Sequence, residues 1–179
     1  MHSPALPKIR KCTKKVLIFR IVLILLLVLN YSFIWHNSSK VSKASDKTSK
    51  TIARDVAKVV VKDYNKLSPR NQQKHVNKLN GTIRSFGHFI EFVPLGFLLF
   101  MLGAVLFDFN KRKLLYVVSI CTLFSVILSL VCALSDETHQ IFVQGRSFQV
   151  SDMAVDTLGA LLGCVVAALP VCIFKKRIL

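Results

Sequence analysis

The sequence predicts an all-α, polytopic membrane protein with four transmembrane helices and a basic, amphipathic helical segment outside the membrane. The chain has 179 residues, 53% of them hydrophobic, and a mean hydropathy of +0.50. Its apolar residues are gathered into runs that are too long for a soluble core, whereas a membrane-spanning helix needs about 20 such residues. These runs place the protein in a membrane.

Four runs have the required length. They are residues 16–35, 86–107, 114–134 and 152–174. The first run follows a basic segment, as in a signal peptide, but no small-residue cleavage site follows it, so we expect a retained anchor. The expected divisions are a basic tail with the first span (1–35), a basic linker with an amphipathic helix (36–83), a three-helix region (84–174) and a basic tail (175–179).

The basic residues predict the orientation of these spans. The net charge is +16, and the short stretches 110–113 and 175–177 are dense in Lys and Arg, as is the N-terminus. Alternation across four spans puts all three on one side, and cytoplasmic loops carry such an excess, so we expect both termini in the cytoplasm. The stretch 136–152 is then extracytoplasmic. No nucleic-acid-binding motif accompanies the charge, so the expected partner is the lipid bilayer of the cell membrane and not a nucleic acid.

The segment 36–83 carries 11 basic and 3 acidic residues. Its first part, residues 36–50, is rich in Ser and Lys and is expected to be a linker that buries nothing. Its second part places the following apolar residues on one helical face: Ile52, Val56, Val59, Val60, Tyr64 and Leu67. Ser68 and Pro69 favour the start of a second short helix. The amphipathic helix fits two uses, contact with anionic headgroups or wall polymers and a solvated spacer, and the sequence leaves both open.

Ionisable residues gather at the predicted extracytoplasmic ends of three spans. They are Arg84, His88 and Glu91 in the second; Asp136, Glu137 and His139, with the neutral amide Gln140, after the third; and Arg146, Asp152 and Asp156 before and in the fourth. Ionisable groups at membrane depth are costly, so their convergence indicates either a functional site or a salt-bridge network that holds the helices together. Gly159 and Gly163 follow on the acidic face of the fourth span and would let another helix approach closely.

Helical periodicity assigns these residues to faces. Arg84, His88 and Glu91 fall within one narrow stripe. Asp136, His139 and Gln140 share a face if the third helix continues beyond the apolar run, while Glu137 points about a quarter-turn away.

Two segments carry a resemblance to a known family. "RSFGHFIEFVPLGFLLF" (84–100) and "LSDETHQIFVQGRSFQVSDMAVDTLGALLG" (134–163) resemble the VanZ-like family of small bacterial membrane proteins, over roughly residues 80–170. The family's motif residues fall on Arg84, His88, Glu91, Asp136, Glu137, His139, Gln140, Gly145, Arg146, Asp152, Asp156 and Gly159. Ser85 stands where a Lys is common and Gln144 where a Pro often precedes Gly-Arg, so an anion clamp would depend on the two arginines. The resemblance implies a role in a Gram-positive cell envelope and, in some members, resistance to glycopeptide antibiotics such as teicoplanin.

Two classes of function compete for this polar end. In the first, the cluster binds an anionic lipid-linked or glycopeptide-type amphiphile through Arg84, Gln140, Arg146, Asp152 and Asp156, because guanidinium groups match phosphates and carboxylates. In the second, the protein is an enzyme acting on lipid-linked envelope substrates. Its candidate acid, base and orienting groups are His88, His139, Glu91, Asp136 and Glu137.

A metal site is a variant of these hypotheses. His88 with Glu91, and Asp136 with His139, each place two possible ligands on one helix face. Nearby arginines would repel a cation, so we expect no metal and no cofactor. The sequence leaves the oligomeric state open.

Overall fold

The computed structural model describes residues 7–40, 42–109 and 113–178. Four of its helices are long and apolar enough to cross a membrane: α1, α3, α4 and α5. The elements are β1 (Lys8–Ile9), α1 (Lys14–Ser38), α2 (Ser42–Val60), the 3-10 helix η1 (Tyr64–Lys66), α3 (Pro69–Leu106), β2 (Phe107–Asp108), α4 (Leu114–Gln140) and α5 (Val150–Ile178). The prediction of an all-α membrane protein with four spans is confirmed.

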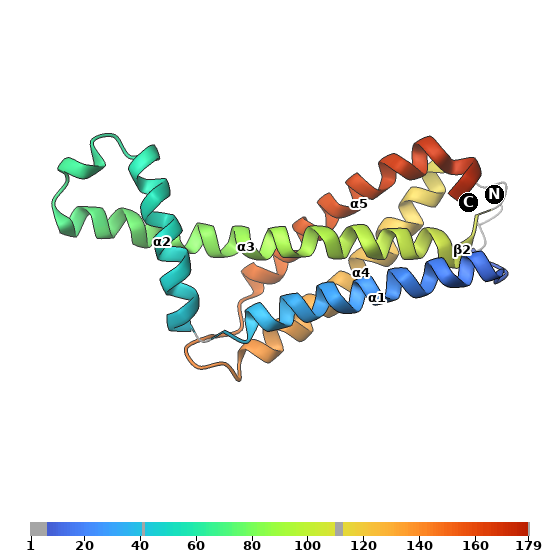
Figure 1. Ribbon diagram of the computed structural model, residues 1–179, viewed down its shortest axis with the longest axis horizontal. Coiled ribbons are helices and arrows are strands. Elements are labelled where there is room, and N and C mark those ends of the chain that lie inside the picture. Colours follow the sequence, from blue (N-terminus) through green and yellow to red (C-terminus); the bar gives the residue numbers. More distant parts are fainter. Residues whose placement is uncertain (1–6, 41, 110–112, 179) are drawn as a thin grey trace.

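The four spans form a bundle in which α3 contacts each of the other three (Figure 1). One apolar core lies toward the end of α3 and includes Phe100, Val117 and Val171, and a second lies nearer the opposite end around Phe92 and Ile34. Helix α1 exposes most of its large apolar side chains. Exposed apolar residues on a bundle of this kind face lipid, so the apolar periphery of α1 is the expected surface of a membrane span.

Helix α3 approaches α5 very closely. A Cβ atom added at Gly96 would overlap the carbonyl of Ala160, one at Gly159 the carbonyl of Phe89, and one at Gly163 the carbonyl of Val93. Small residues allow such backbone contact between membrane helices. The contact fixes how far α5, with its acidic first turns, lies from α3.

The second span is longer than the sequence predicts. Pro69 begins a helix, as expected from Ser68-Pro69, but that helix runs without interruption through 38 residues to Leu106. At 1.5 Å per residue it is about 57 Å long, against about 30 Å for a hydrocarbon core. Its N-terminal part therefore projects beyond the bundle, where it packs with α2 (Figure 1).

The expectations for residues 36–67 need two corrections. The stretch 36–50 is not a linker that buries nothing, because α1 runs to Ser38, α2 begins at Ser42, and Ser38 and Ser49 are buried. The apolar face is also shorter than expected, because α2 ends at Val60 and Tyr64 lies in η1, where it is buried in the small core with Ala53 and Ala57, while Val59 is 87% exposed. Alanine permits the close approach of α2 to α3, so the larger β-branched residues are left on the outside.

A two-stranded antiparallel sheet, absent from the prediction, closes the other end of the bundle. Lys8 pairs with Asp108 and Ile9 with Phe107. The guanidinium of Arg20 donates to the carbonyls of Arg10, Val105 and Leu106. It thereby satisfies carbonyl groups that the end of α3 would otherwise leave without helical partners.

The four spans alternate in direction, so the start of α1 and the end of α5 lie at the same end of the bundle (Figure 1). The prediction that both termini lie on one side of the membrane requires this arrangement. The basic stretch 110–113 was also placed on that side, but residues 110–112 lie outside the described residues. Which end faces the cytoplasm stays a prediction.

Candidate functional site

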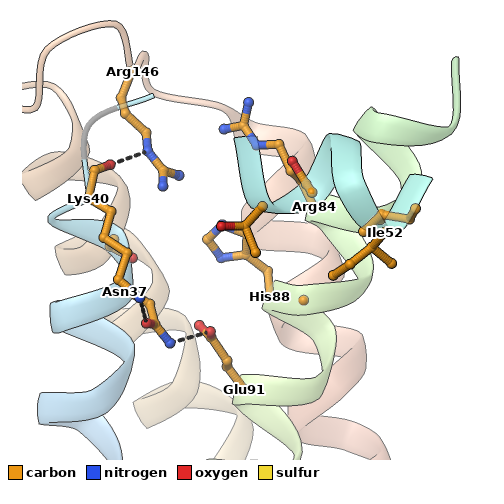
Figure 2. A pocket seen from close by; sticks show the side chains of 12 residues that line it. Asn37, Lys40, Ile52, Arg84, His88, Glu91 and Arg146 are labelled. Carbon is orange, nitrogen blue, oxygen red and sulfur yellow. Dashed lines mark hydrogen bonds between the residues drawn. The ribbon is translucent and has the colours of Figure 1, made fainter. Parts of the chain in front are cut away.

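A pocket lies at the end of the bundle where α1 ends and α5 begins, which we call the polar end. Its volume is about 250 Å³. The wall is formed by α1, α2, α3 and the loop before α5, through Asn37, Ser38, Lys40, Thr48, Ser49, Ile52, Ile83, Arg84, Gly87, His88, Glu91 and Arg146. Figure 2 shows Arg84 and Arg146 facing each other near its mouth, with His88 deeper between them.

The predicted stripe on α3 is one wall of this pocket. Arg84, His88 and Glu91 all line it. Glu91 accepts a hydrogen bond of 2.7 Å from the side-chain amide of Asn37, whose oxygen accepts from Lys40 Nζ at 2.7 Å (Figure 2). The carboxylate of Glu91 is therefore held in place by the end of α1.

Beneath the pocket, α4 contributes a buried polar layer. Asp136, Glu137 and Gln140 are almost completely buried. Ser38 donates to Asp136 Oδ2 at 2.7 Å, and Gln140 Nε2 donates to Asp136 Oδ2 at 2.9 Å and to Glu137 Oε1 at 3.1 Å. The backbone N–H of Gln149 donates to Glu137 Oε2 at 2.7 Å. These bonds join α1, α4 and the following loop, and none of the three α4 residues lines the pocket.

His139 has a different environment from the buried layer. Its ring stacks on Trp35 with centroids 4.1 Å apart, and Ser39 Oγ lies 3.0 Å from its Nε2. His139 and Asp136 thus both contact the end of α1, as their shared face allows. Glu137, which the sequence turns away from that face, is nevertheless buried because the loop before α5 folds over it.

The loop after α4 returns Arg146 to the pocket. Gly145 has φ 78°, a conformation that favours glycine, and it directly precedes Arg146. The guanidinium of Arg146 donates to Gln140 Oε1 at 3.3 Å and to the Lys40 carbonyl at 3.3 Å. Burial lowers the pKa of Arg146 and Arg84 lowers it further, while nearby acids act in the opposite direction. An arginine stays charged despite such a shift, so two like charges face each other at the mouth.

Helix α5 places its two acids behind His88. Asp156 is fully buried, and its Oδ1 lies 3.6 Å from His88 Nδ1. Among the described residues, neither carboxylate oxygen of Asp156 has a hydrogen-bond partner. Asp152 is also buried. Asp156 is therefore the carboxylate that lies against His88, at a distance too long for a hydrogen bond, and within the described part of the chain His88 Nδ1 has no hydrogen-bond partner.

The residue pairs considered for a metal do not converge. Glu91 is bonded to α1 and His139 stacks on Trp35. Within the described part of the chain, no group of three or more His, Cys, Asp or Glu side chains is arranged to hold a metal ion.

The sequence missed the contribution of α1. Asn37, Ser38 and Lys40 lie in the stretch that we expected to be a linker, yet they bond to Glu91, to Asp136 and to Arg146. One signal was available: Trp35, Ser38 and Ser39 continue the helical spacing of the first span beyond its apolar run.

Comparison with known proteins identifies the family. The family model described as VanZ/LLP1 matches residues 16–173. This match also covers the first span and the segment 36–83, so the expected extent of roughly 80–170 was too short. No curated protein and no solved structure matches the chain. Because the match spans most of the sequence and the structure has the four apolar helices, the chain belongs to the VanZ-like family of membrane proteins.

Proposed function

We propose that the polar end faces the outside of the cell and binds an anionic, membrane-anchored amphiphile of the envelope. The observation that carries this proposal is the pair of arginines, Arg84 and Arg146, at the mouth of a pocket that Lys40 and His88 also line. A phosphate or carboxylate between two guanidinium groups accepts charge-assisted hydrogen bonds from both.

The electrostatics of the mouth support an anionic ligand. Arg84 lowers the pKa of Arg146, which expresses repulsion between the two cations. An anion placed between them would relieve that repulsion. Among the described residues that line the pocket, Glu91 is the one carboxylate, and Asp136, Glu137 and Asp156 are not part of the lining.

The surroundings of the pocket favour a ligand with an apolar tail. Ile52 and Ile83 belong to its wall, and Phe86 and Ile90 are 62% and 50% exposed on the part of α3 that follows. A headgroup in the pocket could therefore continue into an acyl or prenyl chain that lies along α3 in the leaflet. Lipid-linked wall precursors and lipidated glycopeptides both have this form, and family membership adds glycopeptide resistance in a Gram-positive envelope to the proposal.

Binding can be measured with the single tryptophan of the chain. Trp35 stacks on His139, one turn from the lining residues Ser38 and Asn37. Protein in a neutral detergent would be titrated with dioctanoyl phosphatidylglycerol and, for comparison, dioctanoyl phosphatidylcholine, while Trp35 emission is followed. We expect saturable binding of the anionic lipid alone.

Variants decide whether the pocket is the binding site. Arg84→Gln and Arg146→Gln should each raise the Kd about tenfold or more, because a hydrogen bond to a charged group contributes about 1.5–3 kcal/mol. Arg70→Gln, at the exposed start of α3 away from the pocket, is the matched control and should leave the Kd unchanged. Equal affinity for all four proteins would refute binding at this mouth.

Orientation needs its own test. A cysteine at the exposed Gln149, in a background with the native cysteines replaced, should react with an impermeant thiol reagent on intact cells. Reaction only after lysis would place the polar end in the cytoplasm. Loss of teicoplanin tolerance on deletion of the gene would connect the binding site to resistance.

A second candidate function is acid/base catalysis on the bound amphiphile, and the contact between His88 and Asp156 favours it. A buried carboxylate beside an imidazole that lines a pocket is a common arrangement for a general base. Under this hypothesis His88→Gln should change the profile of envelope lipids and wall precursors as deletion does, at unchanged membrane abundance. An unaltered profile would leave binding as the function.

A further inference from the structure

Helix α2 has three distinct faces. At 100° per residue, Ile52, Val56 and Val59 fall within about 60° of one another, and Lys47, Arg54 and Lys58 fall within about 40° on nearly the opposite side. Ala53 and Ala57 lie between these two stripes and are the residues buried in the small core with α3. The contact with α3 is therefore lateral, and it leaves Ile52, Val59 and the basic stripe exposed, with Val56 half-buried.

The apolar stripe is exposed, although a helix that serves only as a solvated spacer needs no large apolar side chains aligned on one face. Ile52 is 48% exposed and Val59 is 87% exposed, while the neighbouring alanines are fully buried. Large apolar side chains aligned on one side of a helix indicate an apolar surface beneath them.

The position of α2 defines where that surface is. Figure 1 shows α2 running across α3 rather than along it, so α2 lies along the membrane surface if α3 crosses the membrane. Its level is set by the pocket, which Ile52 lines together with Ile83 and Gly87 of α3. The apolar part of α3 starts at Phe86, so α2 lies at the boundary of the hydrocarbon region.

The direction of the apolar stripe is also fixed. Ile52 lines a pocket whose far wall is Glu91, deeper in the bundle, so it points toward the membrane side of α2 (Figure 2). Val59, two turns further along, points the same way. The basic stripe then points away from the membrane core, where lysine and arginine reach lipid phosphates.

We propose that α2 is an interfacial helix. It lies in the leaflet at the polar end, with Ile52, Val56 and Val59 at the boundary between headgroups and acyl chains and with Lys47, Arg54 and Lys58 among anionic headgroups. A helix with one apolar and one basic face binds anionic membranes in this way. The inference does not depend on which molecule the pocket takes.

Spin labels on adjacent residues test the proposal. Val59→Cys and its sequence neighbour Lys58→Cys, each made in the full chain with the native cysteines replaced, would carry a nitroxide. The proteins would be reconstituted in vesicles of phosphatidylcholine and phosphatidylglycerol at two protein-to-lipid ratios. Both residues are exposed, so neither label disturbs a core.

Collision rates with oxygen, which partitions into lipid, and with a water-soluble nickel chelate report the depth of each label. We expect the Val59 label to favour oxygen and the Lys58 label to favour the chelate, by several-fold, at both protein densities. Equal access of the chelate to both labels would place α2 in water and overturn the proposal. If the Val59 label is protected from the chelate only at the higher protein density, a second copy of the chain covers the apolar stripe. That result would also overturn the proposal.

Discussion

The close crossing of α3 and α5 makes Gly163 a position where one added methyl group must displace a helix. In Gly163→Ala, the new Cβ would overlap the carbonyl of Val93 and lie 2.6 Å from the backbone nitrogen of Phe97 and 3.1 Å from the carbonyl carbon of Gly96. All three are backbone atoms of a helix, so no side chain can rotate away. Helix α5 itself must move outward.

The expected cost follows from two opposing effects. Overpacking of a close contact costs about 1–3 kcal/mol, and alanine gains about 1 kcal/mol over glycine in helix propensity. Because the obstruction is backbone, we expect the upper part of this range, a net loss of about 1–2 kcal/mol. Gly81→Ala is the matched control, since Gly81 also lies in α3 but has nothing within 4 Å of an added Cβ. It should gain up to about 1 kcal/mol.

The assay is unfolding of the purified protein in mixed micelles by titration with SDS, followed by circular dichroism and Trp35 emission. The midpoint for Gly163→Ala should fall and that for Gly81→Ala should stay or rise. If the two alanine variants unfold at the same SDS fraction, the close packing of α3 on α5 is not what fixes α5 in place.

Three further predictions concern the polar contacts of α1. Ser38→Ala removes a hydrogen bond to the buried Asp136 and should lower stability by about 1.5–3 kcal/mol in the same titration, whereas Ser32→Ala, on the exposed side of α1, should be neutral within about 0.5 kcal/mol. Asn37→Ala frees Glu91 from its amide donor, so we expect weaker binding of anionic lipid with little loss of membrane abundance; unchanged affinity would show that the carboxylate needs no fixed position. Arg20→Ala removes hydrogen bonds to two carbonyls at the end of α3 and to the carbonyl of Arg10, and amide exchange in β1 and β2 should speed up at least tenfold while exchange in α5 is unaffected.

The spans were predictable because their signal is the length of an apolar run. Most of their observed ends lie within a few residues of the predicted ones. The extension of α3 back to Pro69 was not predictable from that signal, because residues 69–85 are polar and stabilised by packing against α2. The two short strands were missed because pairs of two residues have no periodicity to detect.

The candidate site was predictable along each helix but not between helices. Periodicity put Arg84, His88 and Glu91 on one stripe, and all three line the pocket. The pairing of His88 with Asp156 depends on how far α5 is rotated and how closely it approaches α3, which a single sequence does not specify. The role of Asn37 was missed for a related reason. A polar residue after an apolar run usually marks the point where a helix leaves the membrane. Here the hydrogen bond from Asn37 to Glu91 of α3 makes it part of the site.

Helix α1 is attached to the rest of the bundle by polar contacts near its two ends, through Arg20 at one and Asn37 at the other. The helical rise fixes the separation of these attachments at about 26 Å, slightly less than the hydrocarbon thickness of an average bilayer, about 30 Å. Neither attachment can slide without breaking hydrogen bonds. The protein therefore has a preferred bilayer thickness, and a thicker membrane must thin around α1 or strain its contacts with the pocket.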